Sequence, residues 1–600
     1  MQAILRFLSM TCCAGLLAAQ AAPTASQQLL AVFDAIQAFR DHEDPMEAIA
    51  RGRPAEATRI MDRSLAAIER RQQSSIDFLK QLRAIDHAAL SERERLDAEL
   101  IERDLAMGIE GHAFGGYTLV VGPLGGPQQS VPQMCEQMPF ARAEDVRNHL
   151  ERLRAVPQSL RDQRVLLEKG LQLHITPAKA TLGGVPAQFD AVIAGKLEVL
   201  REPFRRTYPD LSPTQAAELK TAGDAAADAI LREFEGLRDF VRDTYVPQSR
   251  EAIACVELPN GKAWYAFSLR DQTTTDLDPQ AIHHIGLSEV ARIRSEMLHV
   301  IRRTDWFTSQ PEHAKQPDDS LFADFVAFLR SDPRFYFTKG DELLAGYRDI
   351  SKRIDAHLPA LFSTLPRLPY GVREIPRFMA PSQTTAYYMS GNLKAGNPGW
   401  FFANTFALDQ RPKYEMIPLT LHEAVPGHHL QISLSQELPD RHPLRRDLGF
   451  NAFVEGWALY AERLGIEMNL YTDPYDDFGR LLYEMWRSCR LVVDTGMHAL
   501  GWDRARAIDF MQRNTALSTL NIEREVDRYI GWPGQACGYK LGELCISRLR
   551  ADAQKRLGAA FDLRAFHDAV LGEGALPLAV LESRMQRWIT SQAAALPPTN

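Results

Sequence analysis

The sequence predicts a predominantly α-helical (α+β) protein with a small sheet beside its functional site. Apolar residues recur at helical spacing through most of the chain, while aromatic and β-branched runs typical of strands are few and short. The segment HEAVPGHH, which starts at position 422, has the residue types of a metal site. With 600 residues, 45% hydrophobic and 24% charged, the chain can bury a large core.

The first 21 residues have the pattern of an export signal. A weakly positive start precedes an apolar run from Phe7 to Ala19, and Ala19-Gln20-Ala21 is a cleavage site of the A-x-A type. This run is too short to span a bilayer, and no other apolar stretch reaches the roughly 20 residues that a transmembrane helix needs. We therefore expect a periplasmic or secreted protein without a transmembrane anchor. A lipid anchor on Cys12 or Cys13 is the poorer alternative, because the preceding residues are not the usual small ones.

Residues 22–360 are expected to form a helical scaffold that covers the cleft. Amphipathic patterns predict helices at 27–110, 143–168, 186–202 and 213–244. The segment GGYTLVVGPLGGPQQSVP at 115–132 is loop-like, and it lacks the lysine pattern of a phosphate-binding loop. The metal-bearing half would be 361–600, and without a repeat or linker between them the two parts should share one continuous core.

Three short runs have the composition of strands: residues 263–269, 384–391 and 400–406. The last two immediately precede HEAVPGHH in the sequence, so they predict a strand edge beside the site, where an extended peptide could bind through backbone hydrogen bonds. A short hairpin that only covers the core explains them equally well.

Charge and cysteine content exclude several classes of protein. The net charge of −8, the pI near 6.1 and the absence of a basic stripe argue against binding to nucleic acid. After the signal the chain keeps five cysteines at no recognisable spacing, and none resembles a catalytic nucleophile. A disulfide between Cys135 and Cys255 is conceivable in an oxidising compartment, but the sequence alone does not establish it.

The histidines and glutamates around position 422 predict a zinc site. Zinc takes imidazole nitrogen and carboxylate oxygen at about 2 Å, and a catalytic site has three protein ligands and one open position. His422, His428 and Glu455 would be the three ligands. Glu423 would be the general base that takes a proton from the attacking water.

The spacing departs from the HExxH motif, in which the second ligand follows at i+4. That position is Pro426. On an unbroken helix His428 would point roughly 240° away from His422, and His429 would lie about 10 Å along the axis. Pro426 and Gly427 predict an expanded turn that carries His428 back to the metal, with His429 as the alternative ligand.

The string GHHLQ resembles the second half of the HExGHAL helix of thimet oligopeptidase and of the Taq-type carboxypeptidases, with two residues added between the half-motifs. Together with three further segments, it resembles the bacterial family called domain of unknown function 885: FVEGWALYAERLG, LRDQTTTDLDPQAIHHIGLSEVARIRSEM and WPGQACGYKLG. The resemblance implies a zincin-like metallopeptidase architecture, and it selects His428 over His429 as the second ligand.

Several other residues are candidates for the same site. A solvated helix face explains Glu455 and Glu462 as well as metal binding does; Glu462 would orient a histidine N–H. Tyr539 is placed in GQACGYKLG where the related oligopeptidases have a catalytic tyrosine after the ligand helix, so it would stabilise the oxyanion. Arg524 and Tyr529 are alternatives to Tyr539 for this role. Both are also expected to bind substrate, Arg524 by pairing with a carboxylate of the substrate. His283 and His284 are expected to be structural or to face the cleft, not to bind metal.

These observations predict an exported zinc-dependent hydrolase, most plausibly a metallopeptidase that cleaves oligopeptides. The same site could instead cleave a non-peptide amide or an ester. A non-catalytic periplasmic binding or scaffold protein with a degenerate zinc site is the third alternative. The sequence predicts no oligomeric state.

Overall fold

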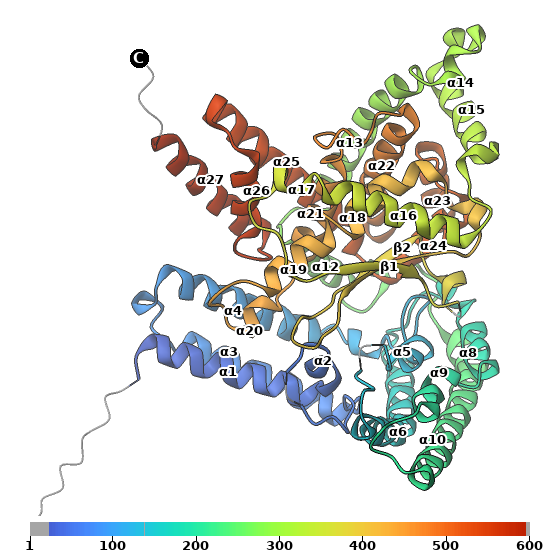
Figure 1. The fold of residues 1–600 in the computed structure, drawn as a ribbon, viewed down its shortest axis with the longest axis vertical. Coiled ribbons are helices and arrows are strands. Elements are labelled where there is room, and N and C mark those ends of the chain that lie inside the picture. The colour runs from blue at the N-terminus through green and yellow to red at the C-terminus, as the bar shows by residue number, and fades with distance from the viewer. Residues whose placement is uncertain (1–22, 54, 137, 378, 596–600) are drawn as a thin grey trace, which may run out of the picture.

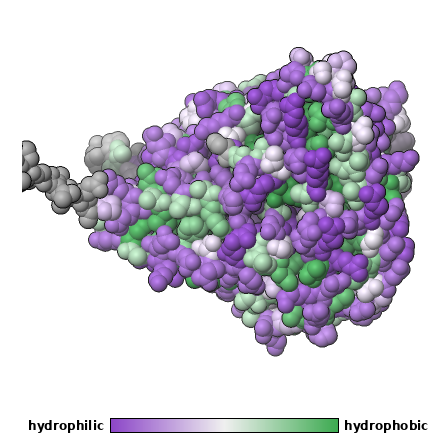
Figure 2. All heavy atoms as spheres, turned by 90° about the horizontal axis from the view of Figure 1, so that it is seen from below, coloured by the Kyte–Doolittle hydropathy of each residue, from purple (hydrophilic) through white to green (hydrophobic). Residues whose placement is uncertain are grey.

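A computed structural model describes residues 23–595 except 54, 137 and 378, and it is predominantly helical with one three-stranded sheet in this part of the chain (Figure 1). The predicted export signal at 1–21 lies outside the described residues. None of the described helices is both long and apolar enough to cross a membrane. The face seen from below is a mosaic in which hydrophilic residues surround smaller hydrophobic patches (Figure 2).

The chain begins with two groups of helices, which lie below the sheet in Figure 1. The first group comprises α1 (Ala25–Glu43), α2 (Pro45–Ala50), α3 (Leu65–Arg83) and α4 (Glu92–His112). The second comprises α5 (Pro127–Gln133), α6 (Ala143–Leu173), α7 (Lys179–Leu182), α8 (Val185–Ala194), α9 (Glu198–Arg201) and α10 (Pro213–Phe240), followed by a π turn and α11 (Val246–Gln248).

Local sequence explains where several of these helices begin. Ser212 caps α10 in a capping box with Gln215, and Pro213 occupies the first turn, where its missing N–H costs nothing. Ser91 and Glu94 form the same box at α4. At the start of α13, Pro279 follows Asp278, whose side chain accepts a hydrogen bond from the N–H of Ala281.

The rest of the chain surrounds the sheet and carries the predicted metal site. Before the sheet come α12 (Gly261–Thr273), α13 (Pro279–Ile301), α14 (Asp305–Thr308), α15 (Asp318–Ser331), α16 (Gly340–Asp355) and α17 (Leu358–Leu361). After it come α18 (Met416–Glu423), α19 (His428–Gln436), α20 (Pro443–Arg446), α21 (Asn451–Arg463), α22 (Pro474–Ala499), α23 (Arg504–Asn514), α24 (Thr519–Gly531), α25 (Gly538–Leu557), α26 (Leu563–Leu571) and α27 (Leu578–Ala594).

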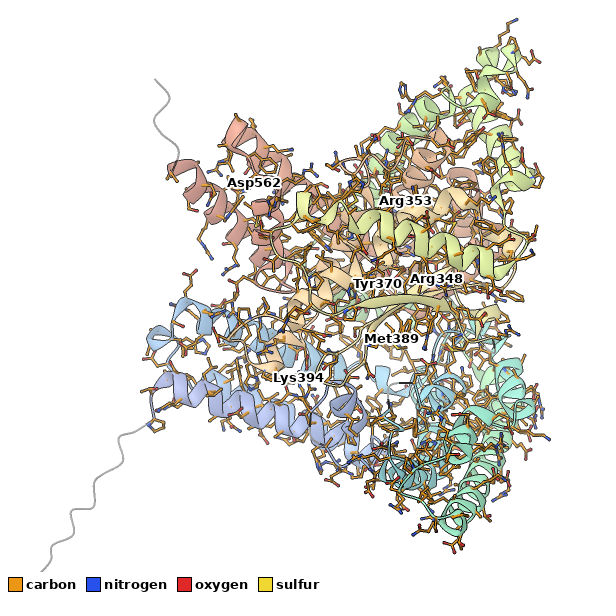
Figure 3. All side chains as sticks on the ribbon, in the orientation of Figure 1. Arg348, Arg353, Tyr370, Met389, Lys394 and Asp562 are labelled. Carbon is orange, nitrogen blue, oxygen red and sulfur yellow. The ribbon has the colours of Figure 1, made fainter. Side chains whose placement is uncertain are left out.

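The sheet has the order β1-β3-β2, with β1 (Tyr370–Glu374) parallel and β2 (Ala386–Met389) antiparallel to the central strand β3 (Gly399–Ala403). Phe401 of β3 faces the main core, where its ring packs on Tyr347 of α16. Arg348 of the same helix lies over β1, where it donates a hydrogen bond to the Val372 carbonyl (Figure 3). Because β3 is the central strand, β2 is an edge of the sheet.

Two of the three predicted strands are confirmed, since 384–391 contains β2 and 400–406 overlaps β3. The prediction of a strand at 263–269 is wrong. These residues lie in α12, where Tyr265 and Leu269, one helical turn apart, are buried in the same apolar cluster. The run is short and aromatic, so composition favoured a strand although its buried positions have helical spacing.

Among the described residues, buried apolar side chains form one main core, a separate second core and two small clusters. The main core includes residues from Leu29 to Ile589, so it joins both sides of position 360. The second core lies within 121–245 and contains side chains of α6, α8 and α10, among them Leu153, Phe189 and Phe234. We call residues 121–246 the helical unit. Cys135 and Cys255, the conceivable disulfide pair, are both free thiols in the structure.

Candidate metal centre

The segment that carries the two histidines is broken into two helices, a larger distortion than the expanded turn that the sequence predicted. The first helix, α18, ends at Glu423, and α19 starts at His428. Between them the peptide bond before Pro426 is cis. The Trp457 indole of α21 donates a hydrogen bond of 2.8 Å to the Pro426 carbonyl and so fixes this turn against the helix that carries Glu455.

Only glycine fits at position 427, because the backbone folds back on the end of α18. A Cβ there would lie 2.0 Å from the carbonyl oxygen of His422 and 2.4 Å from that of Leu421. This close approach returns the chain so that the rings of His422 and His428 lie with centroids 4.7 Å apart. The Pro-Gly insertion is thus the feature that lets a histidine six residues on reach the site of the first.

The structure brings His422, His428 and Glu455 together. One ligand-type atom from each lies within 4.8 Å of the others. Oε2 of Glu455 is 3.6 Å from Nε2 of His422 and 3.4 Å from Nε2 of His428. A tetrahedral zinc ion with bonds of about 2.0–2.1 Å separates neighbouring ligand atoms by about 3.4 Å. Both distances therefore fit one shared ion.

The environment of the Glu455 carboxylate is also that expected of a metal ligand. Oε2 of Glu455 is buried and accepts no hydrogen bond from the described residues, which is costly for a carboxylate unless a cation lies beside it. Burial raises the pKa of Glu455, but the two imidazoles outweigh burial and hold that pKa well below its usual value. The carboxylate is therefore ionised and available as a ligand.

Glu462 lies where it orients His422, in the role that the sequence predicted for it. Its Oε1 is 2.8 Å from Nδ1 of His422 and 3.2 Å from the Arg487 guanidinium. Burial lowers the pKa of His422, but Glu455 and Glu462 raise it to about 9. A bound cation would replace the proton on Nε2, since metal ligands must be deprotonated. The carboxylate on Nδ1 would keep the ring oriented.

His429, the alternative ligand, is occupied elsewhere. Its Nε2 lies 2.9 Å from the Leu368 carbonyl and its Nδ1 lies 2.9 Å from the Tyr388 hydroxyl. Burial lowers the pKa of His429 to about 4, so the ring is neutral. His283 is likewise not near the cluster, because its Nδ1 contacts Thr495 of α22.

The predicted base, Glu423, lines the same cavity of about 280 Å³ as the three predicted ligands. Among the described residues no hydrogen bond or ion pair involves its carboxylate, so a water molecule in the cavity could reach it. The neighbouring cavity wall is formed by Thr384–Tyr388, which include the edge strand β2. Figure 3 labels Tyr370 on β1 and Met389 at the end of β2, which mark the two outer strands of this sheet.

Tyr539 also lines the cavity, with its ring stacked 6.4 Å from that of His422. It is placed there by a close crossing of α21 and α25, in which a Cβ on Gly456 would lie only 2.4 Å from Cα of Gly542. Its hydroxyl oxygen accepts hydrogen bonds of 3.0 Å from Arg528 and 3.3 Å from Gln535. With both donors directed at the oxygen, the hydroxyl proton is free to point into the cavity.

The other two predicted substrate residues are not in the cavity wall. Arg524 is exposed on α24, whereas Arg528, one turn later, lines the cavity. Tyr529 is buried, and its hydroxyl accepts hydrogen bonds from Trp486 and Arg490. The motif EREVDRYIG indicated an arginine near the site. Arg524 and Arg528 are one helical turn apart, however, and the sequence alone did not show which of them faces the cavity.

Sequence reasoning missed several residues of the cavity wall. Three arginines line it, and each has buried partners that hold its guanidinium in place: Arg487, Arg490 and Arg528. Burial lowers the pKa of Arg528, but Tyr539 and Glu525 outweigh burial and raise it, so the guanidinium keeps its charge. Tyr388 and Leu124 also line the cavity. Nothing in the local sequence of Leu124 indicated that it lies near the histidines.

The comparisons with known proteins agree with the family resemblance. The family model described as "Bacterial protein of unknown function (DUF885)" matches residues 45–585. A crystal structure of a presumed lipoprotein from Colwellia psychrerythraea is similar over 95% of this chain and 100% of that chain, with 25% identity and a TM-score of 0.85.

A second solved structure, a presumed lipoprotein of unknown function from Shewanella oneidensis, shares the fold. It covers 94% of this chain and 100% of its own, with 18% identity and a TM-score of 0.67. No curated protein matches the chain. The fold is therefore one that solved structures already represent, while the chemistry of the site has to be argued from its residues.

Proposed function

Because this chain belongs to the bacterial family of unknown function DUF885, its function has to be inferred from its site, and we propose that it is a zinc-dependent peptidase acting on oligopeptides. The observation that carries the proposal is the convergence of His422, His428 and Glu455 beside the unpaired carboxylate of Glu423. A structural zinc site would close its coordination with a fourth protein ligand, whereas three ligands facing a cavity leave a position open.

His422, His428 and Glu455 would hold the ion, and when bound it would lower the pKa of water and polarise the scissile carbonyl. Glu423 would take the proton from the attacking water and pass it to the leaving amine. The Glu462 carboxylate keeps His422 in the tautomer whose Nε2 faces the site. Arg487 holds that carboxylate in turn, so the order of the site extends beyond the ligands themselves.

Tyr539 would donate its hydroxyl proton in a hydrogen bond to the oxyanion that forms on the attacked carbonyl. Arg528 and Gln535 bind the phenolic oxygen and fix its position. We assign Arg528, in place of Arg524, as the charged group that faces the substrate, since it alone of the two lines the cavity.

A peptide substrate is supported by the edge strand β2, whose residues Ala386–Tyr388 line the cavity. An extended peptide could pair with this edge and present its carbonyl to the metal ligands. This arrangement of ligand helices and edge strand is the basis on which we propose a zincin-like architecture. Hydrolysis of a small non-peptide amide or ester remains the alternative for the same site, and a parallel panel of such substrates distinguishes them.

We also propose that the protein is exported. The signal predicted in residues 1–21 supports this, as does the similarity to a protein described as a presumed lipoprotein, because bacterial lipoproteins are exported. Mass spectrometry of the mature N-terminus would test it. Cleavage after Ala21 supports a periplasmic or secreted protein, whereas a lipid on Cys12 or Cys13 would replace that assignment by a membrane anchor.

The decisive experiment compares the wild type with Glu423→Gln after both have been loaded with zinc. We expect one zinc per chain in each, and a fall in kcat of about 10²–10⁴-fold in the variant, the range that a general base contributes. Glu467→Gln serves as a control because Glu467 pairs with Arg463 and Arg550 outside the cavity. A wild type that binds no zinc would exclude the proposed function, and a fully active Glu423→Gln would exclude the proposed base.

A further inference from the structure

The helices α18–α25, which carry the proposed zinc ligands and which we call the metal-bearing helices, do not form the cavity of about 280 Å³ alone. We call this cavity the catalytic cavity. Leu124 lines it together with His422 and Glu455, although it belongs to the loop before α5. Three residues earlier, Val121 is buried in the second core. The helical unit therefore reaches the catalytic cavity through the short turn Gly122–Gly126.

Three glutamine side chains fix this turn. Gln128 donates to the carbonyl oxygens of Gly122 and Gly125, each at 3.0 Å. Gln129 and Gln188 both donate to the Pro123 carbonyl at 2.9 Å. Within the turn, the N–H of Gly122 donates to the carbonyl of Gly125 at 3.0 Å. Since Gln128 and Gln129 are themselves buried, these bonds are shielded from water and hold Leu124 in one place.

The same segment also forms the wall of a second and larger cavity. Leu119, Val120 and Gly126 line a space of about 740 Å³ together with residues of α3, α4 and α6. The catalytic cavity, with about 280 Å³, lies on the side of Leu124. This volume is slightly smaller than the roughly 300–1,000 Å³ that ligand pockets occupy. The turn thus contributes a residue to each cavity, Leu124 to the catalytic one and Gly126 to the larger one.

Leu124 and Leu419 are the two leucines of the catalytic lining, in which the other side chains are mostly polar or aromatic. Leu419 is only 3% exposed and belongs to the main core, whereas Leu124 is half-buried and keeps free surface. A substrate that reaches this end of the cavity therefore meets one aliphatic side chain on a fixed turn.

This inference rests on the proposed peptidase function. We propose that the Gly122–Gly126 turn is a fixed stop that closes one end of the catalytic cavity. It restricts substrates to short peptides whose terminal residue at that end is aliphatic, and Leu124 is the specificity-determining side chain. Longer peptides would have to displace the turn, which its bonds to the three glutamine side chains oppose.

The test measures binding, so that it does not depend on turnover. Zinc-loaded Glu423→Gln is titrated calorimetrically with peptides from dipeptides to octapeptides, extended at either end and terminating in leucine or aspartate. We expect short leucine-terminated peptides to bind at least about tenfold more tightly than long or aspartate-terminated ones, an effect of the size that a small apolar contact gives. Adding Leu124→Gly should remove most of this preference while the zinc content stays at one per chain.

A second variant tests the turn without touching the cavity. Gln188→Leu removes one of the two bonds to the Pro123 carbonyl, and we expect it to weaken the length preference in the same direction. Leu173→Ala is the matched control, because Leu173 is exposed at the end of α6, away from the lining. The proposed stop would be contradicted if Leu124→Gly kept the same preference for short leucine-terminated peptides, or if zinc-loaded Glu423→Gln bound no peptide. Peptide binding without any turnover in the wild type instead overturns the proposed hydrolase and leaves the stop supported.

Discussion

The metal-bearing helices α18–α25 and the helical unit are stabilised in different ways. The helical unit packs regular amphipathic helices around an apolar second core. Around the metal centre, in contrast, charged side chains are buried and each depends on a specific partner, as Glu462 depends on Arg487 and Glu525 on Arg490. The comparison teaches that the broken helix and most of the buried ion pairs lie beside the predicted metal ligands, whereas the helical unit buries only a few charged side chains, among them Arg152 and Arg201.

Mutations in the two regions should therefore differ in their effect on zinc content and turnover, although their cost in stability is similar. Removing one partner of a buried ion pair leaves an uncompensated charge, at a cost of about 3–5 kcal/mol. Truncating a core side chain costs a similar amount, about 2–5 kcal/mol, through the cavity that it leaves. Stability alone does not distinguish the regions, so zinc content and turnover have to be measured beside it.

The largest effect should come from Gly427→Ala. Its Cβ would lie 2.0 Å from the His422 carbonyl, so the turn between α18 and α19 cannot keep its shape. We expect His428 to leave the site, zinc to be lost and peptidase activity to disappear. Metal analysis by mass spectrometry, with circular dichroism to confirm folding, measures this; one zinc per chain in the folded variant would contradict the assigned role of the turn.

Tyr539→Phe should have the next largest effect. Losing one donor to an oxyanion lowers kcat by about 10²–10³-fold, while zinc content and KM should stay near their wild-type values. The matched control in the helical unit is Tyr208→Phe, which removes a buried hydroxyl that donates to the Pro203 carbonyl. Steady-state kinetics on both variants decides the point, and equal kcat values would exclude Tyr539 from the reaction.

The sequence predicted the long helices of the helical unit more accurately than α12 and the sheet. Amphipathic spacing at 213–244 located α10 almost to its ends, because there the local pattern, the cap that Ser212 provides and the packing agree. At α12 they disagree, and a helix with an aromatic composition was mistaken for a strand. Two of the three predicted strands are confirmed, but β1 was missed, whose Tyr370–Glu374 run is short and carries two charged residues.

Within the site, residue types predicted which three side chains cluster but not what surrounds them. His422, His428 and Glu455 come together as expected, because Pro426 and Gly427 signalled a distorted turn. Which of Arg524 and Arg528 faces the cavity depends on how α24 is rotated, and that is set by tertiary packing. Leu124 could not be found from the sequence, since its place in the cavity results from how the whole helical unit is positioned.

Glu462→Gln should have a smaller effect than the changes above. Loss of a carboxylate that orients a histidine ligand lowers metal affinity by about 10–100-fold, and the variant should still bind zinc when the ion is in excess. A competition titration with a chelator measures the affinity. The control is Glu235→Gln on the exposed face of α10, where we expect no change; an identical affinity in both variants would show that Glu462 does not support His422.

The smallest expected effect is an increase in stability from Gly236→Ala in α10. The new Cβ would meet no atom within 4 Å, and the residue is exposed in a regular helix. Alanine should therefore raise the free energy of unfolding by about 0.5–1 kcal/mol, because glycine loses more backbone entropy on folding. The shift of the urea midpoint measures it, with zinc content and kcat unchanged. The same substitution thus stabilises the helical unit and abolishes the site at Gly427. A loss of stability at Gly236 would mean that the helical unit, too, depends on close contacts that amphipathic spacing does not reveal.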